Sequence, residues 1–148
     1  MAPANMHATA VVLGDRCVLV AGQSGSGKTA LALALVAKFR AAGRFARLVS
    51  DDQVFLSVHH GRLLCHAPAV IAGLAEVRGV GPVPVEHEAA AAVDLLVRLV
   101  PASEVERLPG QDSEPILDCM TQRLLLAERE IAATIPTILA RLGITLFA

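Results

Sequence analysis

The sequence has little excess charge of either sign, and this excludes several classes of partner. Its 13 basic and 14 acidic residues give a formal net charge of -1 at pH 7. The basic residues are scattered and form no clustered patch of the kind that binds nucleic acid or an acidic membrane. We therefore expect no nucleic-acid or membrane partner, while a local phosphate site remains compatible with this charge.

Long apolar runs and paired cysteines are also missing. Charges or polar loops interrupt each run before the ~18 consecutive apolar residues that a membrane helix needs. The opening residues, MAPANMHATA, lack the charged region of a signal peptide. The three cysteines, Cys17, Cys65 and Cys119, are odd in number and lack CxxC spacing. We expect reduced thiols in a cytoplasmic protein.

No repeat or linker divides the chain, so we expect a single domain over residues 1–148. The apolar runs at 8–13 and 17–22, separated by Gly14 and Asp15, predict a hairpin. Residues 29–42 are strong helix formers with Leu31, Leu35 and Phe39 on one face, and Gly43 is placed to end the helix. Further strands are predicted at 44–50, 54–58, 61–67, 73–81 and 94–100. Residues 101–115 predict a loop, and 120–142 a helix that Pro136 should break or kink.

The stretch GQSGSGKT fits the pattern G-x-x-x-x-G-K-[ST], between an apolar strand and a helix start. Glycines let successive N–H groups surround an anion, and the helix N-terminus adds partial positive charge. Lys28, which we expect on a solvent-facing turn, supplies a cation for the outer phosphates, and Thr29 a hydroxyl for Mg²⁺. The expected nucleotide-binding residues are Gly22, Gln23, Ser24, Gly25, Ser26, Gly27, Lys28 and Thr29.

Asp51 and Asp52 follow the strand predicted at 44–50. An aspartate there can hold Mg²⁺ or its water, act as a base, or merely cap the strand. Two carboxylates ~4 Å apart repel by about 4 kcal/mol at an effective dielectric of ~20, so one of them is a candidate base. Lys28 and Mg²⁺ within reach of both would offset this repulsion, and the sequence leaves the two cases open.

Five segments in a fixed order resemble the catalytic P-loop domain of HPr kinase/phosphorylase. These are His7, GQSGSGKT, RLVSDD, EVRGVG and ERL, spread from His7 to Gly110. EVRGVG is the most diagnostic segment, because it resembles the family's E-[IV]-R-G-[LV]-G signature. The resemblance implies an α/β P-loop fold of the HPr kinase/PEP carboxykinase-like type, with a mixed central sheet and flanking helices. It also implies phosphorylation of a serine of HPr, the phosphocarrier protein of the sugar phosphotransferase system, with ATP and Mg²⁺.

The resemblance also assigns roles to individual residues. It makes Asp52 the general base, assisted by Asp51, and Lys28 the cation that neutralises the transferred group. It makes Thr29 and Glu76 the Mg²⁺ ligands, with His7 and Arg107 completing the catalytic set. Without the resemblance, His7 reads as a surface residue, Glu76 with Arg78 as a cross-strand ion pair, and Arg107 as a loop charge.

Some features depart from the family pattern. Ala30 stands where the family usually has an acid, and the C-terminal segment needed for phosphate removal is not recognisable, so that activity is left open. With His7 so near the start, the chain resembles the short, alphaproteobacterial form without the N-terminal domain. The resemblance does not fix whether the chain forms a homo-oligomer.

Two other functional classes stay open. One is a small-metabolite kinase, whose acceptor pocket would need the arginines Arg123, Arg129 and Arg141. The other is a nucleotide-dependent sensor without transfer chemistry.

Overall fold

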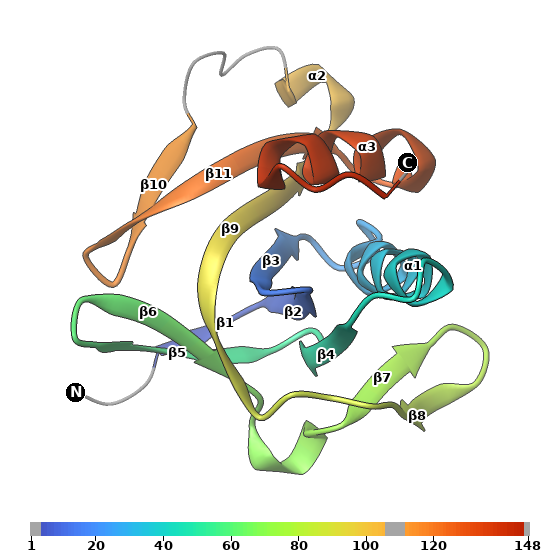
Figure 1. The fold of residues 1–148 in the computed structure, drawn as a ribbon, viewed down its shortest axis with the longest axis horizontal. Coiled ribbons are helices and arrows are strands. Elements are labelled where there is room, and N and C mark those ends of the chain that lie inside the picture. Colours follow the sequence, from blue (N-terminus) through green and yellow to red (C-terminus); the bar gives the residue numbers. More distant parts are fainter. Residues whose placement is uncertain (1–3, 106–111, 147–148) are drawn as a thin grey trace.

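One long strand, β9 (Ala90–Val100), organises the computed structural model, which describes residues 4–105 and 112–146 (Figure 1). Its first residues pair antiparallel with β6 (Arg62–His66). Its later residues pair in parallel with β3 (Arg16–Gly22) on one side and β11 (Cys119–Ala127) on the other. The sheet order is β1-β5-β6-β9-β3-β2-β4, with β11 and then β10 beyond β9. The remaining strands of this sheet are β1 (Ala4–Met6), β2 (Ala8–Leu13), β4 (Ala46–Ser50), β5 (Val54–His59) and β10 (Ser113–Ile116). The mixed central sheet expected from the sequence is confirmed.

The predicted hairpin is present. Strands β2 and β3 pair antiparallel around Gly14, whose φ of 65° is the left-handed conformation that a tight turn requires. Strands β5 and β6 form a second hairpin. The EVRGVG segment, residues 76–81, supplies the end of β7 (Leu74–Val77), the turn, and the start of β8 (Gly81–Pro84), and these two strands form a separate sheet. Two of the four residues of β8 are prolines, which cannot donate to a ladder.

Helix α1 (Lys28–Ala41) forms where the sequence predicts it. Leu31, Leu35 and Phe39 are all buried, as their spacing requires. Gly43, at φ 71°, ends the helix, and the Arg44 N–H reaches back to the Phe39 carbonyl at 2.9 Å. This is a Schellman motif, so the predicted glycine stop is confirmed.

The sheet is buried on both faces, which explains why its central strands are apolar throughout. Along β3, Val18 and Val20 point to one face, while Cys17 and Leu19 point to the other. Helices α1 and α3 (Ile131–Leu142) cover the Val18 face, and residues of β5, β6 and β10 close the Cys17 face. Within this second core, the hydrogen bond to Cys65 and then burial raise the pKa of Cys17 well above its usual value, so Cys17 is a protonated thiol.

Two predictions about the last third of the chain are wrong. The expected loop at 101–115 contains a short helix, α2 (Ala102–Val105), and strand β10. The expected helix at 120–142 is a strand, β11, followed by α3, because pairing with β9 and β10 outweighs helix propensity. Pro136 does not break α3; it is exposed in the second turn, where water can bond the carbonyl that the proline leaves unpaired. A 3₁₀ turn, η1 (Ala69–Ile71), completes the described elements, and no helix in 4–105 or 112–146 is long and apolar enough to cross a bilayer.

Candidate active site

The loop between β3 and α1 has the geometry of an anion-binding P-loop. Gly27, the residue before α1, has a φ of 99°, and the Leu31 N–H donates to its carbonyl at 2.9 Å. Gly22 is packed so closely that a Cβ there would lie 2.5 Å from Ser26 Oγ and 3.1 Å from the Leu99 carbonyl oxygen. A side chain at either glycine would therefore disturb the loop. The following helix directs its unpaired N–H groups and its partial positive charge toward the loop.

Backbone carbonyls of the loop hold the Lys28 side chain in place. Nζ donates to the carbonyls of Gly22 at 3.0 Å and Gln23 at 3.3 Å, and lies 3.6 Å from Asp52 Oδ1. The side chain is only 5% exposed, so the expectation that Lys28 faces solvent is wrong. Its ammonium group is thus positioned between the loop and Asp52, where a P-loop lysine meets the β- and γ-phosphates.

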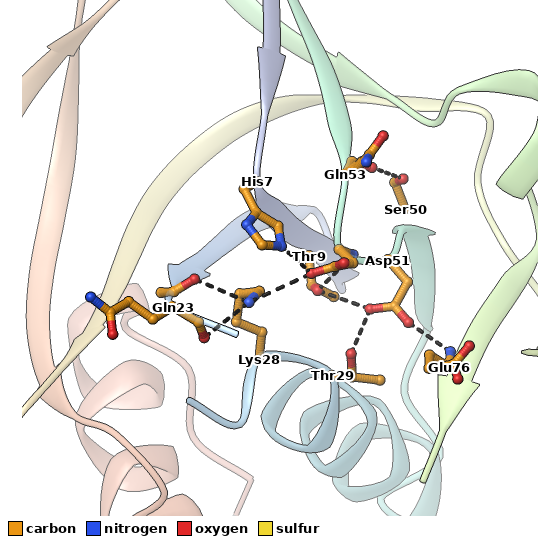
Figure 2. Close-up of polar contacts among 11 residues, drawn as sticks. His7, Thr9, Gln23, Lys28, Thr29, Ser50, Asp51, Gln53 and Glu76 are labelled. Atoms are coloured by element: carbon orange, nitrogen blue, oxygen red, sulfur yellow. Dashed lines mark hydrogen bonds and ion pairs between the residues drawn. The ribbon is translucent and has the colours of Figure 1, made fainter. Parts of the chain in front are cut away.

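Asp51 is buried, and both of its carboxylate oxygens accept hydrogen bonds (Figure 2). Oδ1 accepts from the Thr9 hydroxyl at 2.9 Å and from the Thr29 hydroxyl at 2.7 Å. Oδ2 accepts from the Glu76 backbone N–H at 2.7 Å. A buried carboxylate needs this many donors to offset the loss of water. Asp51 therefore ties together β2, the start of α1, and β7.

Asp52, in contrast to the buried Asp51, has a side chain that is 57% exposed. Its φ of 65° turns it away from Asp51, a left-handed conformation that aspartate tolerates better than most residues. Oδ1 lies 2.6 Å from His7 Nε2. The Asp52 N–H donates to Thr9 Oγ1 at 3.1 Å. The two neighbouring carboxylates thus have different partners, and of the two only that of Asp52 is open to a reacting group.

Thr29, Asp51 and Glu76 have the chemistry of a Mg²⁺ site that relies on phosphate. Glu76 is exposed on the wall of the cleft, opposite Thr29. In the described chain, no group of three or more His, Cys, Asp or Glu side chains is arranged to hold a metal ion by itself. Mg²⁺ commonly binds through one or two protein oxygens plus substrate phosphates, and these residues fit that pattern.

Two clefts lie on either side of this loop. The first, of about 740 Å³, is lined by the P-loop, Asp52 and Glu76. The second, of about 490 Å³, is lined by His7, Gln23, Arg98, Glu104 and Glu128 among others. Because His7 lines one cleft and Asp52 the other, their 2.6 Å contact lies where the two clefts meet.

The structure thus brings together the predicted residues His7, Lys28, Thr29, Asp51, Asp52 and Glu76, along with the loop residues 22–27. Arg107 lies outside the described residues, and its role stays a prediction. Glu76 does not pair with Arg78 through their side chains in any described ion pair; its backbone bonds Asp51 instead.

Two parts of the site were missed in the sequence. Thr9 joins Asp51 to the Asp52 backbone through one hydroxyl, and the available signal was a hydroxyl inside an otherwise apolar strand. The turn between β11 and α3 was also missed. There the Arg129 N–H donates to the Ser26 carbonyl at 3.0 Å and the Glu128 N–H to the Val100 carbonyl at 2.8 Å. This turn holds the P-loop against the end of β9.

Comparison with known proteins gives a consistent result. The family model described as HPr Serine kinase C-terminal domain matches residues 1–124. A protein named HPr kinase/phosphorylase from Bordetella petrii is 31% identical over 121 residues, covering 74% of this chain and 37% of the relative. One of the same name from Clostridium beijerinckii is 35% identical over 80 residues, 54% of this chain and 24% of the relative. The chain therefore spans only a minor part of the length of these relatives.

A solved structure, the Hpr(Ser) kinase/phosphatase from Coxiella burnetii, superimposes with a TM-score of 0.76 at 25% identity. The match covers 95% of this chain and 90% of that chain, so the expected P-loop kinase fold is confirmed. With the family model extending over residues 1–124 as well, the chain belongs to the family of HPr serine kinase C-terminal domains.

Proposed function

We propose that this chain is the catalytic domain of a protein serine kinase, which transfers the γ-phosphoryl group of ATP to a serine of HPr. In this proposal residues 1–148 act as one domain, in the cytoplasm, where ATP is found and where its free thiols would stay reduced. The observation that carries the proposal is the His7–Asp52 contact, 2.6 Å long, beside Lys28 and at the meeting of two clefts.

The first cleft would take the nucleotide and the second the acceptor. With the triphosphate wrapped by residues 22–29, the γ-phosphate would lie near Lys28 Nζ and thus near Asp52. A serine entering past His7 from the second cleft would approach that phosphate from the other side. Phosphoryl transfer needs this alignment and countercharge more than it needs a covalent nucleophile.

Asp52 would accept the serine proton as the serine oxygen bonds to phosphorus and the bond to the leaving ADP oxygen breaks. Its exposed carboxylate and its contact with His7 support this role, since a general base must be within reach of the acceptor hydroxyl. Lys28 would balance charge on the transferred group. Thr29 and Glu76, with Asp51 behind them, would hold Mg²⁺, which when bound neutralises the phosphate oxygens.

The alternative of a small-metabolite kinase is less well supported. Its acceptor pocket would need free arginines, yet Arg123 contacts Glu114 at 3.0 Å and Arg129 contacts Glu128 at 2.6 Å. Arg141 is engaged with Gln122 and the Asp112 carbonyl. Phosphate removal, in which phosphoserine gives its phosphoryl group to inorganic phosphate and leaves serine and pyrophosphate, would use the same groups with Asp52 returning the proton to serine, and the relatives' names include a phosphorylase activity.

The test is to incubate the protein with γ-labelled ATP, Mg²⁺ and HPr, and to find the labelled residue. We expect label on one serine of HPr and none on HPr with that serine replaced by alanine. Label on free serine, on a sugar, or on the alanine variant would contradict the protein-kinase proposal. Nucleotide binding without any transfer would favour the sensor.

A further inference from the structure

The first cleft is longer than its phosphate-binding part. Lys28, Asp52 and Glu76 mark the end at which the γ-phosphate would lie. The other walls are Ala30 and Leu33 on α1, facing Val77 and Arg78 on the β7–β8 hairpin. At about 740 Å³, the cleft is large enough for a whole nucleotide.

These walls form an apolar surface. Ala30 and Leu33 are three residues apart on α1, so they lie on one side of the helix. Leu33 and Val77 are both partly exposed, which leaves apolar area for a ligand to cover. We propose that the nucleoside half of the triphosphate lies on this shelf of Ala30, Leu33 and Val77, and that the shelf accepts adenine and guanine about equally.

The lack of base discrimination follows from the residue types. Apart from the P-loop residues, Asp52 and Glu76, the only polar side chain among the described residues that line this cleft is that of Arg78. Its exposed, planar guanidinium can stack on either purine. A pocket discriminates strongly between analogues when buried polar groups would be left unpaired, and an apolar shelf has none to leave.

This inference rests on the proposed use of a nucleoside triphosphate but is tested without an acceptor. Calorimetric titration of the whole chain with ADP, GDP and inorganic pyrophosphate separates phosphate binding by the P-loop from nucleoside binding by the shelf, because pyrophosphate has the phosphates and no nucleoside. We expect ADP and GDP to bind within about threefold of each other, and both about tenfold or more tighter than pyrophosphate.

Leu33→Ala gives the second comparison, with Val36→Ala as its matched control. Both side chains are partly buried and pack on the same core, but only Leu33 lines the cleft. We expect Leu33→Ala to weaken the binding of ADP and GDP about tenfold and to leave the affinity for pyrophosphate unchanged. Val36→Ala should alter none of the three affinities. Wild-type titrations test the proposal even if a variant fails to fold.

Equal wild-type affinities for pyrophosphate and ADP would overturn the proposed nucleoside shelf but leave the proposed kinase standing. A preference of more than twentyfold for one purine would do the same. An equal effect of Leu33→Ala on pyrophosphate and ADP would overturn it too. If the wild-type chain bound none of the three ligands, pyrophosphate, ADP or GDP, both the proposed kinase and the shelf would be overturned.

Discussion

His7 Nε2 and Asp52 Oδ1 lie 2.6 Å apart, although 45 residues separate them in the sequence. His7 sits at the bend between β1 and β2, and Asp52 at the turn after β4. Strand β2 pairs with β4, and this pairing brings the two positions to the same end of the sheet. The imidazole therefore fixes the orientation of a carboxylate that is otherwise exposed to solvent.

Replacing His7 tests this orienting role. We expect His7→Gln to lower the transfer rate by about tenfold or more while ADP affinity changes little, because Asp52 loses the partner that positions it. Transfer assays quenched at a series of times give the transfer rate, and calorimetry gives the ADP affinity. His59→Gln, at an exposed histidine on β5, is the control and should change neither. An unchanged rate for His7→Gln would remove His7 from the catalytic set.

Thr9 is predicted to support both aspartates through its hydroxyl. Thr9→Val keeps the shape but removes the donor to Asp51 and the acceptor for the Asp52 N–H. We expect a loss of about 1–3 kcal/mol in unfolding free energy, together with slower transfer.

Urea denaturation measures the stability, and Thr9→Ser should restore both properties. Thr134→Val, at a buried threonine of α3 bonded to the Ile131 carbonyl, should lower stability without slowing the folded enzyme. Transfer by folded Thr9→Val at the wild-type rate would contradict the role given to Thr9.

Lys28→Met should keep the fold and abolish productive nucleotide use. The methionine fills most of the buried space of the lysine stem but brings no charge to the phosphates. We expect label transfer to fall by about a hundredfold or more, with a melting temperature close to that of the wild type. Wild-type turnover by this variant would contradict the role given to the Lys28 charge.

The acidic limb of the stability curve should depend on Glu114. Hydrogen bonds from Arg98 at 2.6 Å and 2.7 Å and from Arg123 at 3.0 Å lower the pKa of Glu114, with Arg98 the larger cause. A lowered folded-state pKa means that the stabilisation is complete above the ordinary value of 4.5 and is lost as the pH falls through the lower folded value.

Glu114→Gln should therefore be less stable than the wild type at pH 7, and the difference should be smaller at an acidic pH close to the lowered folded-state pKa of Glu114. Urea midpoints at both pH values measure this. A difference in stability of the same size at both pH values would show that the ion cluster of Arg98, Glu114 and Arg123 does not cause it.

The parts of the fold that local patterns determine could be predicted from the sequence. Gly14 and Gly43 need left-handed backbone, and the four-residue spacing of Leu31, Leu35 and Phe39 defines one helix face, so the hairpin and α1 were predictable. Strand β11 was not, because its leucines favour a helix and become a strand only by pairing with a distant β9.

The site divides in the same way. The loop residues 22–29 and the pair Asp51 and Asp52 stand out by motif alone. Their different roles do not, because the φ of 65° at Asp52 and the three donors around Asp51 arise from β2, α1 and β7 together. The second cleft depends on Arg98 of β9 and on Glu128 in the turn after β11, and the sequence does not reveal that these two strands pair.

The most direct test of the account is a single-turnover comparison of wild type and Asp52→Asn at saturating γ-labelled ATP, Mg²⁺ and HPr. Asparagine keeps the size of the side chain but cannot take up the serine proton at this position. The account predicts that transfer to the HPr serine slows by about 10² or more while ADP affinity stays within a few-fold. Equal losses in affinity and rate would contradict it, because Asp52 would then act as a metal ligand and not as the base.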